Sequence, residues 1–374
     1  MSASKESSLM RELGRMDHTV TLLVVLLLCL GLTMVLSAGS VIPGLSDKYY
    51  YFKRQLIFVG AGGVLCAFAA YLPRRILYNL PYPMLAFALI LLVVTLLFGR
   101  EINGATRWLS LGFLSIQPLE LAKLSLVMYL AYFLATKQHM VGSFRNGIIP
   151  PFAVTGVLSL LLLLQPDFGG PVSLALILFF MCLVGGTRLI YLLLSAVLCG
   201  GMGALLVLYS PYRYQRVISF LDPFQDPQNG GYQLVQSFLA LGSGGIFGVG
   251  LGASKQKLSF LPEMHTDFIV SIMGEELGFI GMTVLFVLVG MLVWRGLLIA
   301  YRQEDLRDRL LAFGVVLIIA LGAMLNLAVI MGVVPTKGVA MPFLSYGGSS
   351  MVCTLAAVGL LLNFSRTAVR RSAQ

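Results

Sequence analysis

Charge is scarce in this sequence. Asp, Glu, Lys and Arg together make up 11% of its 374 residues, whereas soluble domains carry about 25%. Hydrophobic residues reach 58%, and the mean hydropathy is +0.90. This balance excludes a disordered chain, a collagen-like chain and an ordinary soluble enzyme. It indicates that most of the chain faces lipid or other apolar helices.

The residues that build disulfide frameworks and zinc sites are also few. Five cysteines lie inside apolar runs and form no CxxC pair, so we interpret them as small buried hydrophobic side chains. Three histidines, His18, His139 and His265, are too scattered for a zinc site. There is no P-loop, and the glycine-rich stretch from Gly242 to Gly252 lacks the preceding strand that a dinucleotide fingerprint requires.

What the sequence does contain is a series of long apolar stretches. A membrane-spanning helix needs roughly 20 apolar residues, and ten stretches meet this need: 19–39, 55–72, 80–98, 118–136, 148–164, 170–187, 189–209, 267–296, 309–331 and 348–364. We therefore expect an all-α polytopic membrane protein with ten transmembrane helices. We expect one domain over residues 1–374, with tails at 1–18 and 365–374 and a long loop at 210–266.

Basic residues indicate which loops face the cytoplasm. Most Lys and Arg of the short loops fall on one side when the N-terminus is placed inside, as the positive-inside rule requires. The excess of 26 basic over 16 acidic residues is therefore first a topology signal, not evidence for nucleic-acid binding. Both termini are then cytoplasmic, and loop 210–266 lies outside. Its Tyr, Phe and Gly content predicts an ordered loop with short amphipathic helices at the membrane interface.

Polar residues gather at the outer ends of the spans, where charge is costly and therefore indicates function. After Arg107 and Trp108, Pro118 suits the first turn of a helix on which Glu120 and Lys123 share a face. These residues form either a helix-internal ion pair with an aromatic anchor, or a pair of cations, Arg107 and Lys123, for a phosphate-bearing ligand.

Two further groups lie before and within the long loop. The turn 165–170 places Asp167 where it can cap the following helix. Arg213 and Arg216, three residues apart, form one anion-binding face if the segment is helical, and Gln233 and Ser237 are nearby polar candidates. The alternative is a solvated loop face whose arginines snorkel at the interface.

Acidic residues before and within the eighth span form the fourth group. Asp267 follows Glu263 and His265, and it either caps the helix or takes part in chemistry. Glu275 lies about 12 Å deeper and about 80° around the helix from Asp267, whereas Glu276 points about 180° away. We therefore predict that Glu275 shares a cavity with Asp267, and that both glutamates have partners.

The fifth group is the loop before the last span, where Lys337 and Ser345 lie among small residues. Such a loop either packs closely against helices or lines a site. Together, the basic groups, acids and small polar residues on the outer face suit a ligand with anionic phosphates and sugar hydroxyls, held at the outer leaflet.

Several of these motifs occur together in a known family. Between about residues 19 and 366 the chain resembles the SEDS proteins (shape, elongation, division and sporulation), which are membrane glycosyltransferases of bacterial cell-wall synthesis. The motifs that carry the resemblance are Leu261-Pro262-Glu263-x-His265-Thr266-Asp267-Phe268, Glu275-Glu276-Leu277-Gly278, Gln117-Pro118-x-Glu120-x-x-Lys123 and Ser345-Tyr346-Gly347-Gly348-Ser349. Stretches 335–338 and 165–170 are similar to the division branch, the FtsW proteins, rather than to the elongation branch.

The resemblance implies polymerisation of lipid II into glycan strands, in the inner membrane at the division septum, with the essential acid on Asp267. That residue would act as the base for the acceptor sugar hydroxyl or help to bind a metal. Glu120, Glu263, His265 and Glu275 would support it. The leaving pyrophosphate would be stabilised by a divalent cation, Mg²⁺ or Mn²⁺, or by basic side chains, for which the candidates are Arg107, Lys123, Arg213, Arg216 and Lys337. No organic cofactor is expected.

The resemblance also implies partners. These are an FtsI-type class B penicillin-binding protein transpeptidase, the FtsQ–FtsL–FtsB complex and membrane lipid, with no role for nucleic acid. The alternatives are a lipid II flippase, an elongation or sporulation polymerase, and a scaffold of the division machinery. A flippase should place ionisable groups near the midplane and show two related halves, whereas the polar residues here gather at one face.

Overall fold

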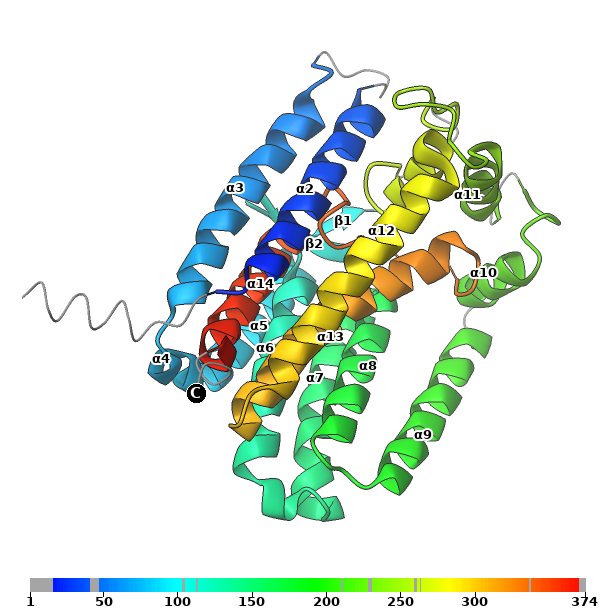
Figure 1. Cartoon of the computed structure of the whole chain (residues 1–374). Coiled ribbons are helices and arrows are strands. Elements are labelled where there is room, and N and C mark those ends of the chain that lie inside the picture. Colours follow the sequence, from blue (N-terminus) through cyan, green and yellow to red (C-terminus); the bar gives the residue numbers. More distant parts are fainter. Residues whose placement is uncertain are drawn as a thin grey trace, which may run out of the picture.

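Helices fill all ten predicted spans (Figure 1). The structure is a computed structural model, and it describes residues 16–40, 47–102, 105–111, 114–209, 211–227, 231–258, 261–262, 264–335 and 338–369. The ten helices are α2 (His18–Gly39), α3 (Tyr50–Tyr71), α5 (Pro81–Phe98), α6 (Pro118–Thr136), α7 (Ile149–Leu164), α8 (Gly169–Val184), α9 (Leu189–Leu208), α12 (Ile269–Tyr301), α13 (Leu306–Ile330) and α14 (Gly348–Val369). Within the described residues, eight helices are long and apolar enough to cross a membrane, and α8 and α9 are shorter apolar helices.

Smaller elements connect these helices. In the long loop, α10 (Pro211–Leu221) and α11 (Tyr232–Ser243) confirm that the described part of this segment is partly helical. The other connecting helices are α4 (Arg74–Asn79), η1 (Gln138–Met140) and η2 (Phe144–Ile148). A small antiparallel sheet, β1 (Arg100–Ile102), β2 (Ala105–Leu111) and β3 (Leu114–Ile116), precedes α6, with Leu109 opposite Ile116. The all-α prediction missed this sheet because its strands are short and lie between two strong helical signals.

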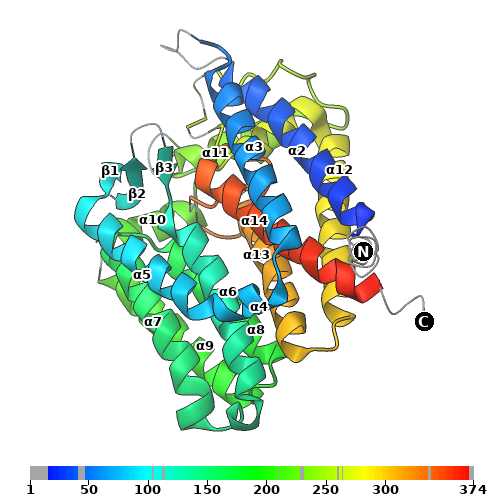
Figure 2. The same cartoon turned by 90° about the vertical axis from the view of Figure 1, so that its left-hand side faces the viewer.

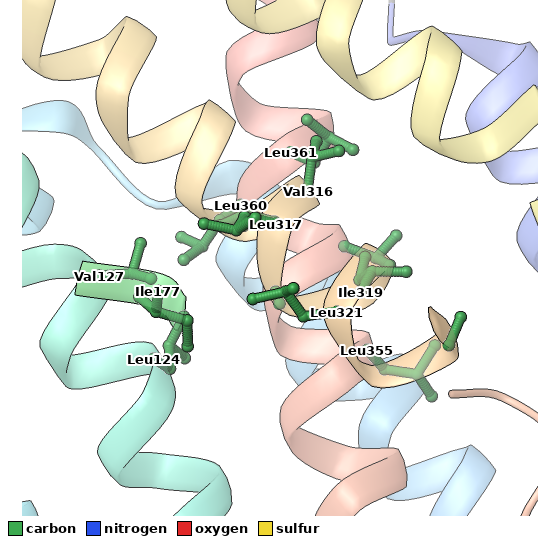
Figure 3. Close-up of a cluster of buried hydrophobic side chains, with 14 of the residues drawn as sticks. Leu124, Val127, Ile177, Val316, Leu317, Ile319, Leu321, Leu355, Leu360 and Leu361 are labelled. Atoms are coloured by element: carbon green, nitrogen blue, oxygen red, sulfur yellow. The ribbon is translucent and has the colours of Figure 1, made fainter. Parts of the chain in front are cut away.

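The hydrophobic core surrounds α13. Figure 3 shows its Val316, Leu317 and Leu321 among side chains of α6, α8 and α14, such as Val127 and Ile177. Helices α3 and α14 pack closely because glycines lie between them: an added Cβ would meet the Leu355 side chain of α14 at Gly62 and the Cys66 carbonyl of α3 at Gly359. By contrast, α9 packs chiefly along α8 and α10 at the edge of the bundle (Figure 1).

Both described termini lie at one end of the bundle, here called the terminal end (Figure 2). Asp17 caps α2 through a hydrogen bond from the Thr19 N–H, and its carboxylate also pairs with Arg295 of α12 at 2.7 Å. The Asp17 N–H donates to Ser365 Oγ, whose hydroxyl donates to the Leu362 carbonyl. On the same helix α14, Asn363 donates to the carbonyls of Ala69 and Leu72.

Helix α12 is broken near its beginning, and the glycine-rich loop after α11 supplies backbone hydrogen-bond partners for the peptide groups at the break. Gly278 has a φ of +64° and a ψ of −161°, which interrupts the helical hydrogen bonds. The N–H groups of Val249 and Gly250 donate to the carbonyls of Glu275 and Glu276, at 3.0 and 3.1 Å. In the other direction, the N–H groups of residues 279 and 280 donate to carbonyls 245 and 246. The stretch that imitates a dinucleotide fingerprint is thus a backbone partner for a broken helix.

We predict that Gly278→Ala destabilises the protein by about 1–3 kcal/mol, because a Cβ there would be strained at positive φ and would press on the Gly248 amide. The matched control is Gly290→Ala in the same helix, where no described atom lies within 4 Å of the added Cβ. This control should be neutral or mildly stabilising. The measurement is unfolding in detergent, and equal stabilities for the two variants would contradict the role of the break.

Candidate functional site

The candidate site lies where α12 begins, at the end of the bundle opposite the terminal end. Asp267 comes two residues before this helix, and its neighbour across the site is Gly338, just after the stretch 336–337 that lies outside the described residues. A Cβ built on Gly338 would lie 3.2 Å from Asp267 Oδ2 and 3.9 Å from Arg107 Nη1. One point therefore lies within 4 Å of both a carboxylate and a guanidinium, which come from distant parts of the chain.

Arg107 is held in this position by the turn between α7 and α8. Its Nη2 donates to the Pro166 carbonyl at 2.7 Å, and its Nε lies 3.7 Å from Asp167 Oδ1. The same Asp167 oxygen accepts from the Gly169 N–H at 3.1 Å, which confirms the predicted capped turn. The turn thus fixes the guanidinium while Nη1 is directed toward Gly338, and the side chain of Arg107 remains 30% exposed.

The backbone carbonyls of residues 265–267 are bound by the C-terminal part of the chain. The His265 carbonyl accepts from the Tyr346 N–H at 2.9 Å, and the Thr266 carbonyl accepts from Ser345 Oγ at 2.6 Å. The Asp267 carbonyl accepts from Asn326 Nδ2 at 2.8 Å. Ser345 was predicted to bind substrate, but its buried hydroxyl is occupied by backbone partners, so the structure supports a structural role instead.

Aromatic rings pack behind these carbonyls. The ring of His265 lies 4.5 Å from that of Tyr51 in α3 and 5.8 Å from that of Tyr346. Burial raises the pKa of the Tyr346 phenol, while the nearby Arg54 lowers it by a smaller amount. Gln55 in α3 donates to the Ser345 carbonyl and accepts from the Gly347 N–H. The predicted supporting role of His265 therefore takes the form of packing under the Asp267 segment.

The two glutamates of α12 have partners, as predicted, but Glu275 does not face Asp267. Its carboxylate accepts from the Lys255 N–H at 2.9 Å, from the Gln256 N–H at 3.3 Å and from the Ser254 hydroxyl. The prediction of a shared cavity with Asp267 is therefore corrected, because the break at Gly278 brings the loop 254–257 against this carboxylate. Glu275 fixes that loop upstream of Asp267.

Glu276 forms a fully buried ion pair with the same loop. Lys257 Nζ lies 2.9 Å from Glu276 Oε1, and the exposed fractions of the two side chains are 3% and 0%. Ser37 of α2 donates to the carboxylate at 2.7 Å and accepts from Lys257 at 3.1 Å. These three residues join loop, α12 and α2 around one shielded charge pair.

The remaining predicted residues are distributed around this site. Glu120 and Lys123 form the expected ion pair on α6 at 2.8 Å, with both side chains largely buried. Ser237 is fully buried between helices, where its hydroxyl bonds to Ser271 and to the Ile330 carbonyl, so its predicted ligand role finds no support. Gln233 is half-buried in the first turn of α11.

Four predicted residues cannot be placed by their side chains. Arg213 and Arg216 fall on α10, which confirms that the segment is helical, but their side chains lie outside the described part. Glu263 and Lys337 also lie outside the described residues. Among the residues that the structure describes, no three His, Cys, Asp or Glu side chains converge on a metal site. Asp267 is an acidic residue of this site that the structure describes, and Mg²⁺ is usually bound through one or two carboxylates together with substrate phosphates.

Sequence reasoning missed Asn326 and Gln55, both 1% exposed within apolar helices. A lone amide in a transmembrane helix is costly unless its polar atoms are bonded, and that cost was the available signal. Because each of these amides needs hydrogen-bond partners, their presence in apolar helices could have indicated that irregular backbone lies beside them.

The fold and site define a class: a polytopic membrane protein whose polar site lies at one end of the helix bundle, between irregular segments. The chain belongs to the FtsW/RodA/SpoVE family, whose description is "Cell cycle protein", and it matches that family over residues 17–370.

Individual relatives cover almost the whole chain. A probable peptidoglycan glycosyltransferase FtsW of Trichlorobacter lovleyi is 44% identical over 95% of this chain and 94% of its own length. The stage V sporulation protein E of Bacillus subtilis is 40% identical over 94% of this chain and 97% of its own. The rod shape determining protein RodA of Thermus thermophilus has a similar structure, with a TM-score of 0.71, 32% identity, and coverage of 94% and 97%.

A second solved structure has a TM-score of 0.80, with 33% identity and coverage of 94% of this chain and 98% of the other. It comes from a peptidoglycan synthase complex described by its structural coordination of polymerization and crosslinking. The predicted family and the polytopic helical fold are therefore confirmed.

We predict that Lys257→Met destabilises the protein by about 3–5 kcal/mol, because it leaves the Glu276 carboxylate buried without its cation. Combining it with Glu276→Leu should recover much of this loss. The matched control is Lys53→Met, which removes the exposed pair with Asp47 and should change stability little. Unfolding in detergent measures all three variants, and a Lys257→Met loss no larger than that of Lys53→Met would contradict the prediction.

Proposed function

We propose that this protein is a peptidoglycan glycosyltransferase that polymerises lipid II at the outer face of the cytoplasmic membrane during division. Relatives of similar length that are named FtsW support this proposal, as does the likeness to a chain of a peptidoglycan synthase complex. The observation that carries the chemistry is the position of Asp267 Oδ2 and Arg107 Nη1 around one point beside Gly338.

A carboxylate and a guanidinium that both lie within 4 Å of one point can serve the two reacting ends of a glycosyl transfer, the attacking hydroxyl and the leaving pyrophosphate. The donor strand carries undecaprenyl pyrophosphate on its terminal sugar C1, and the acceptor is the 4-hydroxyl of a new lipid II. As the hydroxyl oxygen attacks C1, Asp267 accepts its proton. The bond from C1 to the pyrophosphate oxygen breaks at the same time, and Arg107 stabilises the negative charge on the departing pyrophosphate.

Other cations are proposed to assist the pyrophosphate. Arg213, Arg216 and Lys337 are candidates from the sequence, whereas the charge of Lys123 is already balanced by Glu120. A divalent cation remains a prediction that can be tested by chelation. Such an ion would be held by Asp267 together with the pyrophosphate oxygens, and it would add positive charge at the leaving group.

The buried glutamates argue against a transporter. A flippase should hold ionisable groups where substrate passes near the midplane. Here Glu275 is saturated by the loop 254–256, and Glu276 is neutralised by Lys257. Because both carboxylates hold a loop, they do not support translocation, and the arrangement favours the polymerase.

The proposal extends to partners and location. Because a similar chain occurs in a complex that couples polymerization to crosslinking, we propose a class B penicillin-binding protein as the transpeptidase partner. We also propose the FtsQ–FtsL–FtsB complex as a regulator and the division septum as the location. The basic loops favour cytoplasmic termini, which places Asp267 on the outer side.

We predict that Asp267→Asn lowers the rate of glycan polymerisation by about 10²–10⁴-fold, because the amide cannot accept the proton of the acceptor hydroxyl. The assay is polymer formation from lipid II by purified protein in detergent. Asp47→Asn, which changes an exposed carboxylate, is the control and should retain activity. An active Asp267→Asn protein would remove Asp267 from the role of base.

We predict that Gly338→Ala lowers kcat by on the order of tenfold or more, because misplaced reacting groups slow catalysis steeply. The new methyl group would crowd Asp267 Oδ2 at 3.2 Å and fill the space in front of Arg107 Nη1, while thermal stability should change little. Gly242→Ala in α11 is the control, since no described atom lies within 4 Å of its added Cβ. Equal rates for the two variants would show that the space beside Gly338 is not used in the reaction.

A further inference from the structure

We propose that Asn326 and Ser345 are positioning residues that hold the backbone of Asp267 so that its carboxylate faces Arg107. This inference rests on the proposed function, because it assigns the two residues a purpose in the same reaction. Neither side chain touches the reacting groups, so each acts through the main chain of residues 265–267. We call the donors to these three carbonyls, Tyr346 N–H, Ser345 Oγ and Asn326 Nδ2, the main-chain clamp.

Asn326 links the two sides of the site with one amide group. Its Nδ2 donates to the Asp267 carbonyl at 2.8 Å and to the Val339 carbonyl at 2.7 Å. Val339 follows Gly338, which lies beside the Asp267 carboxylate. The amide therefore sets the separation between the segment that carries the proposed base and the segment that faces it.

The position of Asn326 makes this link rigid. The residue lies on α13, the helix around which the hydrophobic core is built, and it is 1% exposed. A buried amide with few rotameric alternatives in a close-packed core has little freedom to move. The packing of the core around Asn326 thus restricts the position of the Asp267 carbonyl.

Ser345 completes the clamp on the neighbouring carbonyl. Its hydroxyl donates to the Thr266 carbonyl at 2.6 Å and accepts from the Met341 N–H at 2.8 Å. Because three consecutive carbonyls are bound, the peptide planes from His265 to Phe268 are fixed, and they set the direction in which the Asp267 Cα–Cβ bond leaves the main chain. An Asp at the end of an unrestrained loop would sample many directions.

The terminal end of the bundle offers two matched controls with the same chemistry. Asn363 also donates from Nδ2 to two carbonyls, at 3.0 and 2.8 Å, and is 6% exposed. Ser365 also donates to one carbonyl and accepts from one backbone N–H, and is 1% exposed. Truncating these residues costs comparable hydrogen bonds at the opposite end from the proposed site.

The experiment compares Asn326→Ala with Asn363→Ala, and Ser345→Ala with Ser365→Ala, in the full-length protein. Polymerisation of labelled lipid II gives kcat and KM per folded molecule, and thermal unfolding in detergent gives stability. We expect Asn326→Ala to lower kcat by about 10–100-fold, and Ser345→Ala by about three- to tenfold, with KM changed less than threefold. The control variants should lose similar stability but keep kcat within about twofold of the original protein.

The proposal is overturned if each site variant has the kcat of its matched control, or if the loss appears in KM alone. Ser345→Ala, which removes a single oxygen atom, keeps the test decisive if Asn326→Ala does not fold. The outcome for Asp267→Asn separates this inference from the proposed function. An inactive Asp267→Asn beside fully active clamp variants overturns only the clamp, whereas an active Asp267→Asn overturns the proposed base itself.

Discussion

Irregular backbone inside a helical membrane bundle must have its hydrogen bonds satisfied by protein, because lipid supplies none. This constraint explains most of the buried polar residues here. The glycine loop bonds to the break at Gly278, Glu275 accepts from the N–H groups of residues 255 and 256, and Asn326 donates to the carbonyls of residues 267 and 339. The polar interior is therefore arranged first around unpaired peptide groups, and the site is built on the segments that those groups define.

The same constraint separates what the sequence could predict from what it could not. Hydropathy located all ten helices, and spacing along one helix predicted the pair Glu120–Lys123, because both signals are local. The protein partners of Glu275, Ser237 and Ser345 were not predictable in this way, since a polar residue in an apolar segment can serve either a ligand or a peptide group. Only the partner in space decides between them, and partners such as Lys255, Thr266 and Ile330 lie 20, 79 and 93 residues away along the chain.

The proposed reaction site combines parts of unequal rigidity. Asp267 is fixed through its carbonyl to the core helix α13, whereas Arg107 lies on a short strand and is oriented by the turn at Pro166 and Asp167. The main chain that carries the carboxylate thus has a nearly fixed position, and the guanidinium remains partly exposed. This division suits a base that must meet one hydroxyl and a cation that must accept a bulkier pyrophosphate.

The bonds from Glu275 and Glu276 to the loop 254–257 close the stretch from Ser254 to Glu276 into a non-covalent ring that contains Asp267. The stretch between α10 and α11 lies outside this ring, and α11 itself is held on α12 by the hydrogen bond between Ser237 and Ser271. Insertions or deletions between α10 and α11 can therefore change the shape of the outer surface without displacing the carboxylate. That part of the loop can change during evolution to contact new binding partners, while Asp267 keeps its position in the site.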